Sequence, residues 1–201
     1  SYATLADAFT AINAGTHTGA ITISIVGNTT EPAGGAILNA SGAGPASYTS
    51  VLITPSGARS ISGTVTAGSP LIDLNGADNV TIDGLNASGN SLTISNATAS
   101  ATSGTSTIRL IGGATNNTIT NATILGSASM AVATNGGTIF ISTDANTPNG
   151  NDNNTISNNN LGPAGVNLPT KAVACNGSQS TTAIGNSGIT VSNNNIFDYF
   201  G

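Results

Sequence analysis

The chain has 201 residues, a net charge of −5 and only three cations, Arg59, Arg109 and Lys171. So few cations argue against a nucleic-acid partner. Since no apolar run reaches 18 residues, the sequence predicts no membrane-spanning helix. Ser, Thr, Asn and Gly make up 105 of the 201 residues. These residues are poor helix formers, whereas Thr with Ile and Val favours strands and Asn with Gly favours turns.

The first element in chain order is a short amphipathic helix over residues 4–13. Thr4 and Asp7 have the spacing of a capping box. Four apolar residues at helical spacing share one face: Leu5, Ala8, Phe9 and Ile12. We expect this helix to cover the otherwise open end of a repetitive fold.

Short strand patterns follow at 20–26 and 50–54, and from residue 69 the patterns repeat. One strand type occurs at 71–74, 108–111, 139–141 and 172–175. A second type occurs at 79–83, 117–121, 154–158 and 189–193, and 91–96 has the pattern of a third strand type. A long loop is expected at 143–152.

Successive copies of the second strand type lie 37, 37 and 35 residues apart. A period of this size is typical of solenoids and propellers. Because the chain has no Trp and only 3% aromatic residues, a propeller is disfavoured. We therefore predict an all-β fold, a right-handed parallel β-helix, with residues 1–201 forming a single domain capped by the helix at 4–13. One core column should contain Ile82, Ile119, Ile156 and Val191.

An Asn recurs as the last residue of the second strand type, at Asn121, Asn158 and Asn193. Side-chain amides stacked at one corner can bond to the coils above and below and satisfy buried polar groups. Asn also tolerates left-handed corner geometry. The sequence thus predicts a structural ladder made of these three residues.

Three segments carry a family resemblance. Residues 2–13 resemble the helical cap of pectate-lyase-like right-handed β-helix domains, and residues 76–85 and 153–160 look like coils of that fold. In detail, the chain is most similar to β-helix regions of large secreted surface proteins of environmental Gram-negative bacteria. The resemblance implies a secreted or cell-surface location. It says little about activity, because this solenoid carries lyases, hydrolases, adhesins and structural stalks.

The resemblance also directs attention to acids and bases. Polysaccharide lyases of this fold combine Ca²⁺-binding acids with a basic residue, and Asp73, Asp83 and Arg109 are the first candidates for such a carbohydrate or Ca²⁺ site. The other interpretation is that these residues face solvent or form turns. No set of residues identifies a reaction, and the sequence predicts no cofactor.

The C-terminal segment holds three aromatic residues, Phe197, Tyr199 and Phe200, and has no capping helix. A solenoid end without a cap presents bare core and strand edges. Either further sequence continues the stack, or another copy of the chain covers the end in a head-to-tail contact. In the second case these three residues are the candidate assembly interface.

The leading hypothesis is an extracellular structural solenoid, as a stalk, an adhesin segment that contacts a cell-surface matrix, or a self-stacking filament subunit. The alternative is a module that binds or cleaves polysaccharide. Pairs such as Thr64 and Thr66 also resemble the threonine faces of ice-binding solenoids. Such a face would repeat the pair on every coil, and in the sequence the pairs look scattered.

Overall fold

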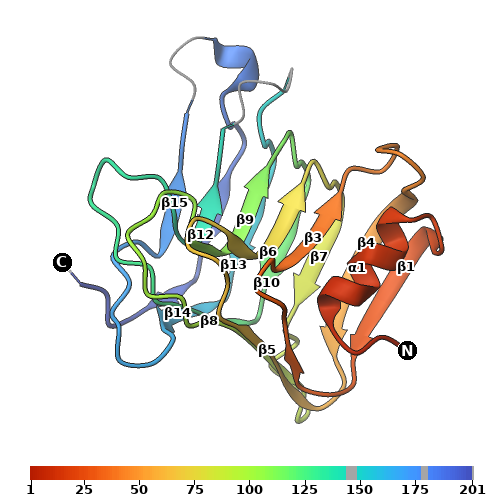
Figure 1. Cartoon of the computed structure of the whole chain (residues 1–201), viewed down its shortest axis with the longest axis horizontal. Coiled ribbons are helices and arrows are strands. Elements are labelled where there is room, and N and C mark those ends of the chain that lie inside the picture. The colour runs from red at the N-terminus through yellow and green to blue at the C-terminus, as the bar shows by residue number, and fades with distance from the viewer. Residues whose placement is uncertain (144–148, 178–180, 201) are drawn as a thin grey trace.

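The computed structural model describes residues 1–143, 149–177 and 181–200. The chain forms a parallel β-solenoid of about five turns (Figure 1). Each turn contributes strands to three parallel sheets, which we name sheets A, B and C. The expected loop at 143–152 lies partly outside the described residues.

Each sheet is built from one strand of each successive coil. Sheet A contains β1 (Thr18–Ile25), β4 (Ser47–Pro55), β7 (Val80–Asp83), β10 (Thr118–Thr120), β13 (Thr155–Ser157) and β16 (Thr190–Ser192). Sheet B contains β2 (Thr29–Thr30), β5 (Ala58–Gly63), β8 (Ser91–Asn96), β11 (Thr123–Gly126), β14 (Asn160–Pro163) and β17 (Asn195–Ile196). Sheet C contains β3 (Ala36–Asn39), β6 (Pro70–Asn75), β9 (Ser106–Ile111), β12 (Gly137–Ile141) and β15 (Val173–Cys175).

The helix α1 (Leu5–Asn13) covers the N-terminal end of the solenoid, as predicted (Figure 1). Thr4 is its N-cap, and the capping box with Asp7 is complete in both directions. The buried carboxylate of Glu31 accepts the backbone N–H groups of Leu5 and Ala6, at 3.0 and 2.8 Å. Since free N–H groups at a helix start carry partial positive charge, Glu31 fixes the helix to the first coil. A short 3₁₀ helix, η1 (Thr182–Ile184), lies in the last coil.

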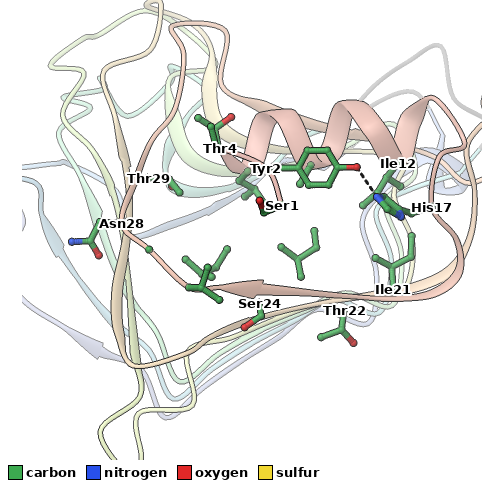
Figure 2. Close-up of a pocket in the computed structure, with 17 residues that line it drawn as sticks. Ser1, Tyr2, Thr4, Ile12, His17, Ile21, Thr22, Ser24, Asn28 and Thr29 are labelled. Carbon is green, nitrogen blue, oxygen red and sulfur yellow. Dashed lines mark hydrogen bonds between the residues drawn. The ribbon is translucent and has the colours of Figure 1, made fainter.

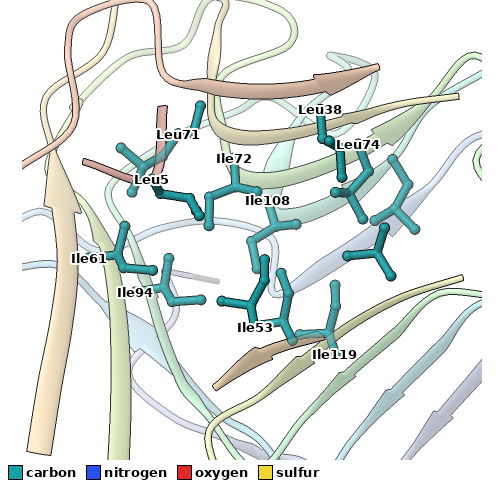
Figure 3. Packing of buried hydrophobic residues seen from close by; sticks show 14 of the residues in the cluster. Leu5, Leu38, Ile53, Ile61, Leu71, Ile72, Leu74, Ile94, Ile108 and Ile119 are labelled. Carbon is teal, nitrogen blue, oxygen red and sulfur yellow. The ribbon is translucent and has the colours of Figure 1, made fainter. Parts of the chain in front are cut away.

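The core consists of apolar columns that run along the solenoid axis (Figure 3). The register pairs Ile119 with Ile82 on one side and with Ile156 on the other, and Ile156 pairs with Val191. These four residues therefore lie in one column. The three isoleucines are at most 1% exposed, whereas Val191 is 48% exposed because β16 is the last strand of sheet A among the residues that the structure describes.

Pairs of adjacent asparagines shape two corners of the coil. The pairs are Asn116–Asn117, Asn153–Asn154, Asn158–Asn159 and Asn193–Asn194. The first Asn of each pair has a left-handed backbone, with φ between 55° and 57°. Asn is the non-glycine residue that best tolerates this conformation. The second Asn turns inward, and it is 1% exposed in the first three pairs.

The inward asparagines form the amide ladder. Asn159 shows its bonding: the side-chain oxygen accepts the N–H of Ala122 at 3.0 Å, and the side-chain nitrogen donates to the carbonyl of Ile119 at 2.9 Å. Towards the next coil, both the backbone N–H and the side chain of Asn159 donate to the side-chain oxygen of Asn194. Asn117 and Asn154 repeat this pattern at the other corner.

The ladder is thus shifted by one residue from the position that the sequence predicted. Asn121, Asn158 and Asn193 occupy the left-handed positions, with φ of 55°, 57° and 55°. Asn158 and Asn193 are exposed, and the Asn121 amide bonds to Asp83 instead of to an asparagine. The physical reason is that a left-handed residue turns the corner, so its side chain points outward and the next side chain points inward.

The two roles predict losses of different size when each Asn is replaced by Gly. Asn159→Gly leaves the Ala122 N–H buried without its acceptor and removes the amide bond to the Ile119 carbonyl, so we expect the free energy of unfolding to fall by about 2–4 kcal/mol. Asn158→Gly keeps a left-handed residue that bonds through its backbone, so the change should stay under about 1 kcal/mol. Urea unfolding of both variants measures the difference, and equal losses would refute the assignment of roles.

Candidate functional site

Asp73 and Arg109 form an ion pair on the outer side of sheet C. The register of β6 and β9 places the two residues side by side in adjacent coils. Arg109 Nε donates to Asp73 Oδ1 at 3.0 Å, and Nη2 donates to Oδ2 at 2.7 Å. This two-point geometry is the strongest arrangement that an arginine and a carboxylate can adopt.

The surroundings of this pair are closed rather than open to a ligand. The Asp73 side chain is 5% exposed and the Arg109 side chain 22%. Phe140, which follows Arg109 in register, is 2% exposed. Because carboxylate and guanidinium bind each other, neither is free to hold Ca²⁺ or to accept a proton from a sugar. The arrangement joins two coils across the sheet surface.

Asp83 lies on a different sheet from the other two candidates, at the end of β7 in sheet A. Its Oδ1 accepts the N–H of Leu85 at 2.8 Å and the side-chain amide of Asn121 at 2.9 Å. The structure therefore does not bring Asp83 into one site with Asp73 and Arg109. Among the described residues, no three His, Cys, Asp or Glu side chains are placed to hold a metal ion.

Replacing one partner of the Asp73–Arg109 pair should lower the free energy of unfolding more than replacing both partners. Arg109→Met leaves the Asp73 carboxylate buried and unpaired, and we expect the free energy of unfolding to fall by about 3 kcal/mol. Adding Asp73→Leu should restore most of that loss, because Ile37 and Phe140 flank this position in register.

Arg59→Met is the matched control, since among the described residues the Arg59 side chain donates only to the carbonyl of Ala58, at 3.0 Å. Thermal unfolding of the three variants gives the comparison. A double variant as unstable as Arg109→Met alone would contradict the account.

The C-terminal aromatic residues fold back onto the preceding coils. Tyr199 packs against the core, and its hydroxyl bonds to the Thr138 hydroxyl at 2.9 Å. The ring of Phe197 lies against Gly162, where any side chain would collide with it. Only Phe200 is largely exposed, at 66%. The sequence could not show this, because Tyr199 and Thr138 are 61 residues apart.

The same end of the solenoid leaves core columns uncovered. Val191 and Ile196 belong to inward columns, yet they are 48% and 52% exposed. Cys175 also ends an inward column, after Ile141, and is exposed. Within the described ranges, strands β16, β17 and β15 are the last members of sheets A, B and C, so each pairs with a strand on one side.

Burial of two tyrosines predicts a loss of stability at alkaline pH. Burial raises the pKa of Tyr199, and burial together with the charge of Asp78 raises the pKa of Tyr48. Above about pH 10 the tyrosines of the unfolded chain lose their protons while those of the folded chain keep them, so the free energy of unfolding falls as pH rises.

Urea unfolding at neutral pH and above about pH 10 measures this loss. Tyr199→Phe removes one of the two groups and should reduce the dependence on pH. A variant with the same alkaline loss as the unaltered chain would show that Tyr199 is not buried as described.

The N-terminal end contains a groove of about 360 Å³ between α1 and β1 (Figure 2). Its apolar lining comes from both elements: Leu5, Ala8, Ile12, Ile21, Ile23 and Ile25. A 2.6 Å hydrogen bond between the Tyr2 hydroxyl and His17 Nε2 crosses its rim. Strand β1 is the first strand of sheet A, and in the part of the chain that the structure describes no strand pairs with its outer edge.

No family model, curated protein or solved structure matches the chain. The three sheets define the fold class as a parallel β-solenoid. The more specific likeness to pectate-lyase-like domains stays a prediction from the sequence. Within the described residues, no helix has the length and apolar character needed to cross a bilayer.

Proposed function

We propose that the chain is an extracellular structural module, a rigid segment of a surface stalk or filament. The observation that carries this proposal is the direction of its hydrogen bonds. Sheets A and B each contain six strands and sheet C contains five, all parallel. Tension along the solenoid axis is therefore shared by the backbone hydrogen bonds and core contacts that join each coil to the next, which suits a load-bearing rod.

The surface composition also supports a structural role outside the cell. Only 5% of the residues are charged, so neutral Ser, Thr and Asn supply most of the polar surface. The acidic and basic candidates for polysaccharide chemistry are engaged with each other or with the backbone. A secreted stalk fits these properties better than a lyase does.

We further propose that one copy stacks on the next, head to tail. The uncovered side chains of Val191 and Ile196 and the free edge of β16 supply one surface. The free edge of β1 and the apolar groove beneath α1 supply the other. Pairing β16 with β1 of a second copy would continue sheet A across the junction, a contact that can repeat without closing.

Replacing one uncovered core residue tests the stacking. Val191→Lys places a charge at the centre of the proposed contact, where burial would be costly, so we expect the association of the purified chain to be lost. Sedimentation velocity over a range of concentrations measures the size of the assembly. Thr93→Lys is the control, because Thr93 faces outward on β8, which lies between β5 and β11 within sheet B, and it should not alter assembly.

Val191→Lys leaves Phe197 and Tyr199 in place, whereas a deletion of residues 197–200 would remove these two residues, which also hold the last coils together. A chain that stays monomeric at every concentration would contradict the stacking. Rods that form equally well with Val191→Lys would place the contact elsewhere.

A further inference from the structure

The outer side of sheet A carries a regular grid of hydroxyl groups. The first outward column contains Thr22, Leu52, Thr81, Thr118, Thr155 and Thr190. The second contains Ser24, Thr54, Asp83, Thr120, Ser157 and Ser192, two residues further along each strand. Five of six positions in each column are Thr or Ser. We call these twelve residues the hydroxyl face.

The sequence hid this face because the coils differ in length. In sheet A, the steps from Ile23 to Ile53, Ile82, Ile119, Ile156 and Val191 are 30, 29, 37, 37 and 35 residues. The Thr and Ser pairs therefore look scattered in the sequence. The register shows instead that both outward positions are Thr or Ser on four of the six strands of sheet A and that one of them is on the other two, so these pairs lie on one face.

The face is open to solvent. None of its twelve residues is buried. Figure 2 shows Thr22 and Ser24 on the side of β1 that points away from α1, whereas Ile21 points towards the helix. Exposed left-handed asparagines border the face, including Asn116 and Asn158.

Most of its hydroxyls are free to bind water. Within the described structure, the Thr120 and Ser157 hydroxyls bond to each other at 3.2 Å, and the Thr54 hydroxyl is shielded without a partner. The remaining hydroxyls of the face make no hydrogen bond to the described residues. They belong to Thr22, Ser24, Thr81, Thr118, Thr155, Thr190 and Ser192.

The grid is neutral and stiff. Asp83 is its one ionisable residue, and two hydrogen bonds hold that carboxylate at the edge of the face. Strand spacing separates neighbouring hydroxyls by about 4.8 Å along the axis, and alternate residues are about 6.6 Å apart along the strand. Because threonine has restricted χ1 freedom, little side-chain entropy is lost when such a surface is ordered by a partner.

We propose that the hydroxyl face binds the ordered water lattice at the surface of ice. A neutral crystal with a fixed repeat is the partner that matches a neutral grid with a fixed repeat. Each hydroxyl can take the place of one lattice water, and the threonine methyl groups occupy the space between. The twelve positions contain no aromatic ring to stack on sugars and no free charge to hold an acidic polymer, which disfavours polysaccharide as the occupant.

The test is partition of the purified chain into a slowly growing ice crystal, together with the rate of ice recrystallisation. We expect the unaltered chain to enter the ice and to slow recrystallisation. Thr118→Arg places a long charged side chain in the middle of the face, so both activities should be lost. Thr93→Arg is the matched control, because Thr93 faces outward on β8 in sheet B, and it should keep both activities.

Circular dichroism and thermal unfolding establish that both variants are folded. Exclusion of the unaltered chain from ice would overturn the proposal. Entry of the Thr118→Arg chain into ice to the same extent as the unaltered chain would overturn it as well. Binding to crystalline cellulose or chitin that Thr118→Arg abolishes, without any effect on ice, would overturn it too and assign the face to polysaccharide. Val191→Lys should keep the ice activities, so failure of stacking and failure of ice binding are distinguishable.

Discussion

Backbone hydrogen bonds between successive coils hold each strand residue beside its equivalent one coil away. In sheet A the register from β4 to β16 contains no shift, so whatever occupies a position is repeated along the axis. Isoleucine then stacks on isoleucine inside, and threonine on threonine outside. The core, the amide ladders and the hydroxyl face are three consequences of that one constraint.

The constraint also explains how a chain with so few charges adopts a single register between its coils. Side-chain amides at the corners bond only to coils that are correctly placed, since a shift by one residue would leave the Asn159 amide and the Ala122 N–H unpaired. The Asp73–Arg109 pair applies the same condition on sheet C. Glu31 and Tyr199 then hold the two ends of the stack, through the start of α1 and through Thr138.

The 37-residue spacing and the pattern of apolar residues were enough to predict the solenoid, the helical cap and the column through Ile119. They could not place the ladder, because the left-handed Asn158 and the inward Asn159 are adjacent residues of the same type. The partner of Arg109 was hidden for another reason: it lies 36 residues away, and only the register between coils brings the two together. Prediction of the hydroxyl face from the sequence would likewise have required the register between coils.

The register itself is most directly tested by disulfide cross-linking in a Cys175→Ser background. Thr118 and Thr155 are paired in adjacent coils, so cysteines at these positions should cross-link readily under mild oxidation. Cysteines at Thr118 and Ser157 would be displaced by two residues, about 8 Å apart, and should not. Preferential cross-linking of the displaced pair would contradict the stacking on which the account depends.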